Sequence, residues 1–206
     1  MLRPVNRLGY ALKRFFDLSF AVLLLLLLSP VLLLLWLLVR LDSRGPAFFR
    51  QPRLGYRGEV FEILKFRTMV DGAEAQGTGI FTSRGDPRIT RTGHLLRRTS
   101  LDELPQLVNI VKGEMSFVGP RPPVPYHPYR YEDYSTEQQQ RFSVRPGITG
   151  YAQVMGRNRL EWNERIQYDL EYVKRWSLLL DAQIIVRTFA TLKGPVFSDR
   201  AKGKAS

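Results

Sequence analysis

The feature that most constrains this chain is an uncharged apolar run at residues 18–39, LSFAVLLLLLLSPVLLLLWLLV. About 20 consecutive apolar residues are typical of a helix embedded in a membrane. Ser29 and Pro30 lie near the middle of the run. Proline has no N–H to donate and its ring clashes with the preceding turn, so a helix kinks or breaks there. The run therefore predicts two helical arms, each roughly 15–20 Å long, against a hydrocarbon core of about 30 Å.

Basic residues flank both ends of this run and predict its topology. They are Arg3, Arg7, Lys13 and Arg14 before it, and Arg40, Arg44, Arg50, Arg53 and Arg57 after it. Lys and Arg gather on the cytoplasmic side of a membrane. A hairpin that enters and leaves the same leaflet satisfies both ends, whereas a single span would place one basic cluster on the wrong side. We therefore expect a re-entrant helix-break-helix, with the Ser29 hydroxyl covering a backbone group freed at the bend.

Two other interpretations of the run deserve comparison. An ordinary kinked transmembrane helix stays open, because membrane helices tolerate proline. A secretory signal peptide is disfavoured, because the run is longer than a signal core and no small-residue cleavage site follows it.

The chain has 206 residues, enough for one soluble domain beside the apolar run, and a net charge of +12. That charge predicts an anionic partner, which is nucleic acid, acidic lipid or a phosphorylated substrate. Beside a membrane anchor, each basic residue adds about 1 kcal/mol of attraction to anionic headgroups. The sequence has no cysteine, which excludes disulfides, thiolate metal sites and a cysteine nucleophile.

The other segments predict an α/β fold that is mostly helical with a short sheet. Strands are expected at 47–53 and 59–66 around a turn at 55–58. Loops are expected at 71–85, 119–128 and 145–150, and helices at 92–111 (two pieces, restarting at Ser100) and 137–142. Lys13 and Asp17 are four residues apart, so we expect them to pair across one helical turn.

Two amphipathic helices are predicted near the end of the chain, at 162–173 and 178–192. Their apolar faces either pack on the core or lie flat on the membrane with Trp176 and Phe189 dipping in, and both options stay open.

Candidate chemistry centres on two adjacent acids, Asp102 and Glu103. Ser100 and Glu103 also fit a capping box, so a purely structural role stays open. The surrounding segments, however, are rich in arginine, whose planar fork suits phosphate oxygens. A carboxylate in such surroundings can hold Mg²⁺ together with substrate phosphates, or attack phosphorus as a nucleophile.

A series of motifs carries a family resemblance, and the match as a whole runs from about residue 13 to about residue 189. They are KRFFD at 13–17, SP at 29–30, LKFRTM at 64–69, TSLDELPQ at 99–106, KGEMS at 112–116, VGPRP at 118–122 and RPGITG at 145–150. In this order they resemble the bacterial sugar transferase family of small monotopic phosphoglycosyl transferases. No additional multi-span region precedes the apolar run, so the chain resembles the minimal form.

The resemblance implies transfer of a sugar-1-phosphate from a UDP-sugar to polyprenyl (undecaprenyl) phosphate, with release of UMP and a requirement for Mg²⁺. Asp102 matches the nucleophile, which forms a covalent phosphosugar intermediate in a ping-pong mechanism, and also the metal contact. Glu103 matches its partner, and Arg121 with Pro122 matches a phosphate-binding turn associated with the nucleotide. The resemblance further implies active-site basic residues at Lys65, Arg67, Arg88 and Arg145.

Together these inferences predict a membrane hairpin at 1–44 (break at 29–30), a catalytic domain with interfacial C-terminal helices at 45–197, and a tail at 198–206. The expected location is the cytoplasmic face of a bacterial inner membrane, where such enzymes initiate glycoconjugate synthesis. Expected partners are the UDP-sugar, the polyprenyl phosphate and membrane lipids, with homo-oligomers possible and no nucleic acid. The alternative function is a membrane-anchored basic protein that binds acidic lipid or nucleic acid without catalysis.

Overall fold

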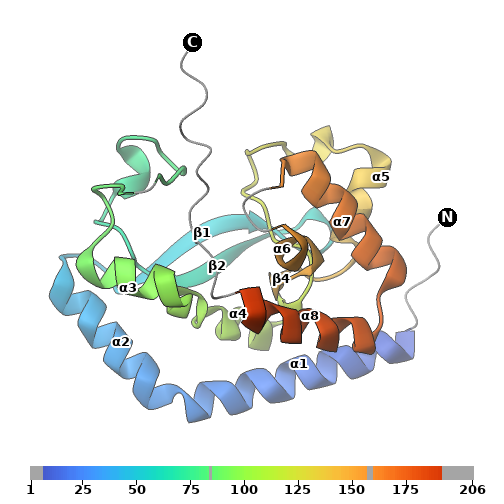
Figure 1. Ribbon diagram of the computed structural model, residues 1–206, viewed down its shortest axis with the longest axis horizontal. Helices are drawn as coiled ribbons and strands as arrows, with labels where there is room; N and C mark the ends of the chain where they lie inside the picture. The colour runs from blue at the N-terminus through green and yellow to red at the C-terminus, as the bar shows by residue number, and fades with distance from the viewer. Residues whose placement is uncertain (1–6, 84, 157–159, 192–206) are drawn as a thin grey trace.

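Two helices joined at a sharp bend form the base of the molecule, and the other elements lie on one side of them (Figure 1). The structure is a computed structural model that describes residues 7–83, 85–156 and 160–191, so the predicted tail at 198–206 lies outside the described residues. The strands of the described residues form two small sheets, each of two strands. The fold is therefore mostly helical, as predicted.

The bend separates α1 (Arg7–Leu27) from α2 (Ser29–Asp42), whose axes differ in direction by 65°. Pro30 has no N–H to offer the Leu26 carbonyl one turn before it. The Ser29 hydroxyl donates to that carbonyl instead, over 2.8 Å. The predicted break and the predicted role of Ser29 are confirmed. Among the described residues no single helix is long and apolar enough to cross a membrane, whereas the bent pair meets that test jointly.

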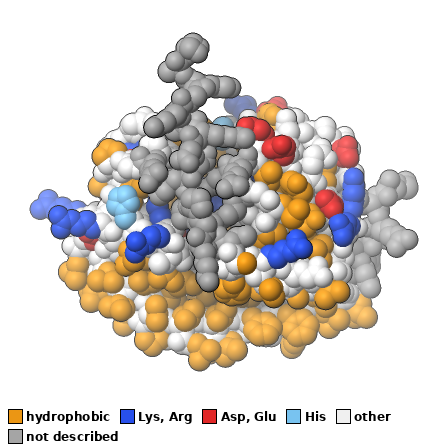
Figure 2. Space-filling view, viewed as in Figure 1, with side chains coloured by type: hydrophobic (Ala, Val, Ile, Leu, Met, Phe, Trp, Pro, Cys, Tyr) orange, Lys and Arg blue, Asp and Glu red, His pale blue; other side chains and the backbone are white. Residues whose placement is uncertain are grey.

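The hairpin has one face against the rest of the molecule and one face open. Ala21 of α1 and Leu35 and Val39 of α2 are buried. Their partners in the two hydrophobic clusters are Ile63, Leu107, Ile110 and Met115 for α1, and Ala47, Phe66 and Leu96 for α2. The outer face exposes large apolar side chains that include Phe16, Phe20, Leu23, Leu27, Leu34 and Leu41. Figure 2 shows a continuous hydrophobic band along this base, which is the kind of surface that marks a membrane or partner contact.

Polar contacts also tie the hairpin to the domain above it. The Lys13 ammonium pairs with Asp181 of α8 (Leu178–Thr191) at 2.6 Å, so the predicted Lys13–Asp17 ion pair is wrong. Asp17 instead accepts a hydrogen bond from the Phe117 backbone N–H at 3.3 Å. Both side chains are buried on the inner face of α1, where partners from distant segments are nearer than the helix's own neighbours.

The larger sheet pairs β1 (Phe48–Leu54) antiparallel with β2 (Val60–Phe66), which confirms the two predicted strands. The smaller sheet pairs β3 (Ser116–Val118) parallel with β4 (Gly147–Thr149). The segment 145–150 was expected to be only a loop. Its pairing depends on glycine, because a Cβ on Gly147 would lie 2.1 Å from the Gly119 backbone nitrogen.

Short helices complete the fold. They are α3 (Arg91–Thr99), α4 (Gln106–Lys112), α5 (Thr136–Gln139), α6 (Tyr151–Met155) and α7 (Trp162–Arg175). The two pieces predicted at 92–111 are α3 and α4, but the second piece begins at Gln106 after a 3₁₀ turn and not at Ser100. The helix predicted at 162–173 is confirmed as α7. The predicted helix at 137–142 is α5 followed by a 3₁₀ turn.

The last helix, α8, has a buried side and an exposed apolar side. Ile184 is buried in the core, whereas Leu179, Val186 and Phe189 are exposed. Of the two options left open for this region, Trp176 fits packing on the core, because its indole nitrogen donates to Asp181 at 3.3 Å. One side of α8 thus packs on the core, and contact of the other side with lipid stays a prediction.

We predict that the bend keeps both ends of the hairpin on one side of the membrane. Reporters fused before Lys13 and after Arg44 should both register as cytoplasmic. Pro30→Leu restores a backbone donor and removes the ring clash, so a fraction of the molecules should straighten and move the first reporter to the other side. The control Val31→Leu alters the neighbouring exposed residue and should leave both reporters in place. Opposite locations in the unmodified chain would rule out a re-entrant hairpin.

Candidate active site

The two adjacent acids lie on a tight turn between α3 and α4. Ser100 adopts a left-handed conformation (φ 57°, ψ 19°) and its backbone N–H closes the end of α3. Its side chain makes no capping bond to the 3₁₀ turn Leu101–Glu103, so the predicted capping box is wrong. A non-glycine residue in this region costs of order 1–3 kcal/mol, and such strain is often found at functional sites. The strained residue turns the chain immediately before Asp102.

Glu103 is held by two cations from distant segments. Its Oε1 atom accepts from the Lys65 ammonium of β2 at 2.8 Å and from the Arg121 guanidinium at 3.2 Å. Burial alone would raise the pKa of Glu103, but Lys65 and Arg121 outweigh it and lower the pKa to about 2. Glu103 is therefore ionised throughout the physiological range, and two of the predicted basic residues, Lys65 and Arg121, meet at it.

Asp102 differs from Glu103 because its carboxylate oxygens are not engaged by the described residues. Within the described part of the chain no residue donates a hydrogen bond to it, although Lys65, Arg97 and Arg121 are near enough to attract its charge. Burial raises the pKa of Asp102 above its ordinary 3.8, and the Glu103 charge adds to the rise. A carboxylate with free lone pairs beside three cations can accept a metal ion or attack an electrophilic phosphorus.

The loop that carries Arg121 is fixed on both sides. The Gly147 N–H of β4 donates to the Pro120 carbonyl at 3.0 Å, and the Arg53 guanidinium of β1 donates to the Pro122 carbonyl at 3.0 Å. Burial, together with repulsion from Arg121, lowers the pKa of Arg53 to about 10. The loop therefore presents Arg121 to the acids from a rigid base, and Pro122 contributes through its carbonyl.

Two predicted active-site arginines make their hydrogen bonds elsewhere. Arg67 is buried and donates to the carbonyls of Val39, Ser43 and Arg44, which closes the end of α2. Arg145 donates to the Gly113 carbonyl at 2.6 Å and lies over the rings of Tyr10 and Tyr56. The structure therefore does not bring either residue to the acid pair, and both stabilise connections between the hairpin and the domain.

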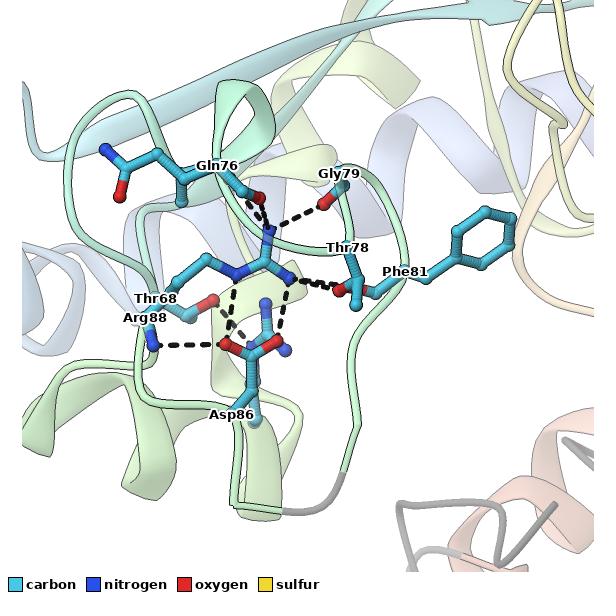
Figure 3. A network of polar contacts seen from close by, with 9 residues as sticks. Thr68, Gln76, Thr78, Gly79, Phe81, Asp86 and Arg88 are labelled. Carbon is cyan, nitrogen blue, oxygen red and sulfur yellow. Dashed lines mark hydrogen bonds and ion pairs between the residues drawn. The ribbon is translucent and has the colours of Figure 1, made fainter. Parts of the chain in front are cut away.

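Arg88 organises the loop before α3 (Figure 3). Its guanidinium pairs with Asp86 at 2.7 Å and donates to four backbone carbonyls, those of Ala73, Gln76, Gly79 and Phe81. Hydrogen bonding to Arg88 lowers the pKa of Asp86 to about 2. All of this guanidinium's contacts thus serve the loop, so the structure does not place Arg88 at the acid pair either.

Arg97 and Arg53 are site residues that our sequence analysis did not single out. Arg97 lies in the last turn of α3, donates from Nε to the Thr68 hydroxyl at 2.7 Å, and attracts Asp102. Arg53 supports the Arg121 loop as described above. In the sequence Arg97 and Arg53 look like the many other arginines, and only their contacts in the folded structure identify them as site residues.

One carboxylate of the acid pair, that of Asp102, could help to hold a divalent metal ion. No group of three or more acidic or histidine side chains suited to metal binding occurs among residues 7–83, 85–156 and 160–191. Mg²⁺ commonly uses one or two carboxylates together with substrate phosphates and water. Asp102 offers such a carboxylate, whereas the bound oxygen of Glu103 is already engaged by Lys65 and Arg121.

Comparison with known proteins identifies the family. Residues 8–194 match the family described as bacterial sugar transferase. The chain belongs to the bacterial sugar transferase family. The resemblance predicted from its motifs, and with it the enzyme class, is therefore confirmed.

Three relatives illustrate how the chain compares with members of this family. It is 44% identical over 97% of its length to an undecaprenyl-phosphate glucose phosphotransferase of Komagataeibacter xylinus, of which it spans 38%. It is 43% identical to the uncharacterized sugar transferase EpsL of Bacillus subtilis, with 86% of this chain and 85% of the relative covered. It is 44% identical to a UDP-glucose:undecaprenyl-phosphate glucose-1-phosphate transferase of Caulobacter vibrioides, with 92% and 73% covered.

We predict that Glu103 tunes the ionisation of Asp102. Glu103→Gln removes the adjacent negative charge, so the pKa of Asp102 should fall. The acidic limb of the pH–activity profile should then move to lower pH, on top of a lower overall rate. The pH dependence of sugar-phosphate transfer measures this. Glu132→Gln, at an exposed site, should leave the limb in place, and an acidic limb that stays or moves upward in Glu103→Gln would contradict the assignment.

Proposed function

We propose that this protein transfers a sugar-1-phosphate from a UDP-sugar to undecaprenyl phosphate through a covalent intermediate on Asp102. The observation that carries the proposal is the open Asp102 carboxylate, which faces three cations while its neighbour Glu103 is bound to two of them. The relatives from Caulobacter vibrioides and Escherichia coli are named UDP-glucose:undecaprenyl-phosphate glucose-1-phosphate transferase, which supports this donor and acceptor.

The reaction proceeds in two displacements at one phosphorus. First, an Asp102 oxygen attacks the phosphorus that carries the sugar, the bond to the bridging oxygen breaks, and UMP leaves with that oxygen. Then a phosphate oxygen of undecaprenyl phosphate attacks the same phosphorus and displaces Asp102, which gives the lipid diphosphate sugar and regenerates the carboxylate. A covalent relay lets one site serve two substrates in turn.

The surrounding cations stabilise charge during both steps. Lys65, Arg97 and Arg121 all attract the Asp102 charge, and fixed cations at developing phosphoryl charge are the main source of catalysis in such reactions. Glu103, with its pKa of about 2, does not store a proton at neutral pH. It instead orients Lys65 and Arg121. Bound Mg²⁺, held by Asp102 and the diphosphate, would neutralise further charge on the donor.

The hairpin explains how a water-soluble donor and a lipid acceptor reach the same residue. The acceptor's phosphate lies at headgroup level, and its chain lies in the leaflet. The exposed apolar face of α1 and α2 suits the leaflet (Figure 2). The segment that carries the acid pair packs against the opposite face of the hairpin, because Leu101 and Leu104 contact the cluster around Leu35 and Val39. We therefore place the catalytic domain on the cytoplasmic face of the inner membrane, anchored in one leaflet.

The proposal predicts that Asp102→Asn abolishes transfer. An amide is a poor nucleophile, so UMP release from a UDP-sugar in the presence of undecaprenyl phosphate should fall at least about 10³-fold. A donor labelled in the sugar should leave a covalent adduct on the unmodified protein and none on the variant. Asp133→Asn, at an exposed site, should keep both signals. Unchanged turnover in Asp102→Asn would eliminate the covalent mechanism.

Removal of divalent metal should also stop the reaction. A chelator such as EDTA should abolish UMP release, and added Mg²⁺ should restore it, because the donor's diphosphate charge is then neutralised again. The protein's melting temperature should stay unchanged, since the described residues form no metal cluster that supports the fold. Full activity in the chelator would show that the acid pair works without a metal.

A further inference from the structure

The segment that carries Arg121, Pro-Arg-Pro-Pro at 120–123, has few hydrogen-bond donors of its own. Three of its four residues are prolines, which have no backbone N–H. All four of its carbonyls, by contrast, accept from other parts of the chain. The donors are the Gly147 N–H for Pro120 at 3.0 Å, the Arg141 guanidinium for Arg121 at 3.1 Å, the Arg53 guanidinium for Pro122 at 3.0 Å and the Leu54 N–H for Pro123 at 2.9 Å. The course of the segment is therefore set from outside.

Arg141 reaches the Arg121 carbonyl from the interior of the protein. It lies in the 3₁₀ turn Gln140–Ser143 that follows α5, and it is 2% exposed. Its Nη2 atom donates both to that carbonyl and to Asp169 of α7, the latter at 2.5 Å. Its Nε atom donates to the same Asp169 oxygen at 3.1 Å. One guanidinium thus joins α7 to the backbone of Arg121, and Figure 1 shows α5 and α7 next to each other.

Stability alone does not account for this buried ion pair. Taking an arginine and an aspartate out of water costs about as much as their attraction returns, and apolar residues of similar volume are often equally stabilising. A buried pair can, however, select one arrangement of the chain. The guanidinium of Arg141 is held in place on several sides, by Asp169, by the Tyr134 hydroxyl and by the rings of Phe142 and Trp162.

The Arg121 side chain extends from this anchored backbone to the acid pair. It is 41% exposed and donates to the Glu103 carboxylate at 3.2 Å. A long side chain that is partly exposed has many rotamers, so the place where it leaves the backbone limits which groups it can reach. A shift of the Arg121 carbonyl would therefore change the charges around the nucleophile. The charged groups that act most strongly on Asp102 are Lys65, Glu103, Arg97 and Arg121.

We infer that Arg141, held by Asp169, is a positioning residue for the transfer reaction and that it acts through the backbone carbonyl of Arg121. The inference rests on the proposed function and deepens it. Among the residues that the structure describes, Arg141 forms its hydrogen bonds and ion pair with Asp169 and Arg121 and none with the acid pair. It keeps Arg121 directed at Glu103 while charge develops on the phosphoryl oxygens, where a fixed cation contributes most.

The test is a double-mutant cycle on Arg141 and Arg121 in the full chain. Arg141→Lys keeps the charge, but lysine is one atom shorter, so its ammonium can pair with Asp169 while it falls short of the Arg121 carbonyl. UMP release, from the UDP-sugar that the unmodified chain uses and with undecaprenyl phosphate, should slow by about 10- to 100-fold, as expected for a misplaced catalytic group. In an Arg121→Gln background the same change should have little further effect, because the group that Arg141 positions is gone.

The pH dependence of UMP release gives a second readout, because Arg141→Lys alters no formal charge. Arg121 lowers the pKa of Asp102, so a loosened Arg121 should let that pKa rise and move the acidic limb to higher pH. Asp169→Asn keeps Arg141 and an oxygen that accepts from it, and it should move the limb in the same direction by less. This second variant serves if Arg141→Lys does not fold.

Ile166→Val is the matched control for lost stability. Ile166 is buried in the same cluster as Phe142, and its substitution removes one methylene without altering a polar contact. The melting temperature should fall, whereas the acidic limb should stay in place.

The inference is overturned if Arg141→Lys slows UMP release equally with and without Arg121, since a purely structural residue acts independently of it. An acidic limb that stays in place or moves to lower pH, or one that Ile166→Val moves equally, overturns it as well. If Arg121→Gln leaves too little activity for the cycle, the limb alone decides. These outcomes are separate from the Asp102→Asn experiment, because the two arginines can act independently even where Asp102→Asn abolishes the adduct, and can be coupled even where no adduct forms.

Discussion

The structure depends on one ion cluster, in which Glu103 receives both Lys65 and Arg121. These residues come from β2, from the turn between α3 and α4, and from the loop after β3. Solvent screens a partly buried ion cluster less than an exposed pair, and removal of one partner is costly because it leaves the other charge uncompensated. The cluster also leaves Asp102 without a hydrogen-bond partner among the described residues. Glu103 therefore connects the segments of the site through Lys65 and Arg121, whereas the Asp102 carboxylate is left available to a ligand.

Buried polar contacts also fix the hairpin of α1 and α2 to the rest of the molecule. Lys13 pairs with Asp181, Asp17 accepts from the Phe117 N–H, and Arg67 closes the end of α2. Phe117 lies in β3, the strand that leads into the Arg121 loop. The position of the site relative to the apolar face of α1 and α2 is therefore set by buried contacts. An enzyme whose acceptor phosphate lies at headgroup level needs this fixed depth.

Much of this architecture follows from local sequence rules. The bend follows from Pro30, and the partner of the freed carbonyl follows from Ser29. The acid pair stands out because Asp102 and Glu103 are adjacent acids in an arginine-rich chain. Long-range contacts could not be predicted in the same way. Lys13 is four residues from Asp17, yet its partner is 168 residues away. Ser100 and Glu103 fit a capping box by spacing, but the backbone at Ser100 is left-handed and the carboxylate is taken by two distant cations.

The arginines show why charge alone does not reveal function. Arg67 and Arg88 cannot be told from Arg97 and Arg121 by residue type or by the local charge of an arginine-rich sequence. In the structure, Arg67 and Arg88 give their donors chiefly to backbone carbonyls, and a guanidinium so engaged has little left for a ligand. The Arg121 guanidinium donates to a single carboxylate, that of Glu103, and its other donors make no hydrogen bond with the described residues. The net charge of +12 therefore includes two kinds of arginine. Some, such as Arg67 and Arg88, donate to several backbone carbonyls and stabilise loops, whereas Arg121 has donors left to bind an anion.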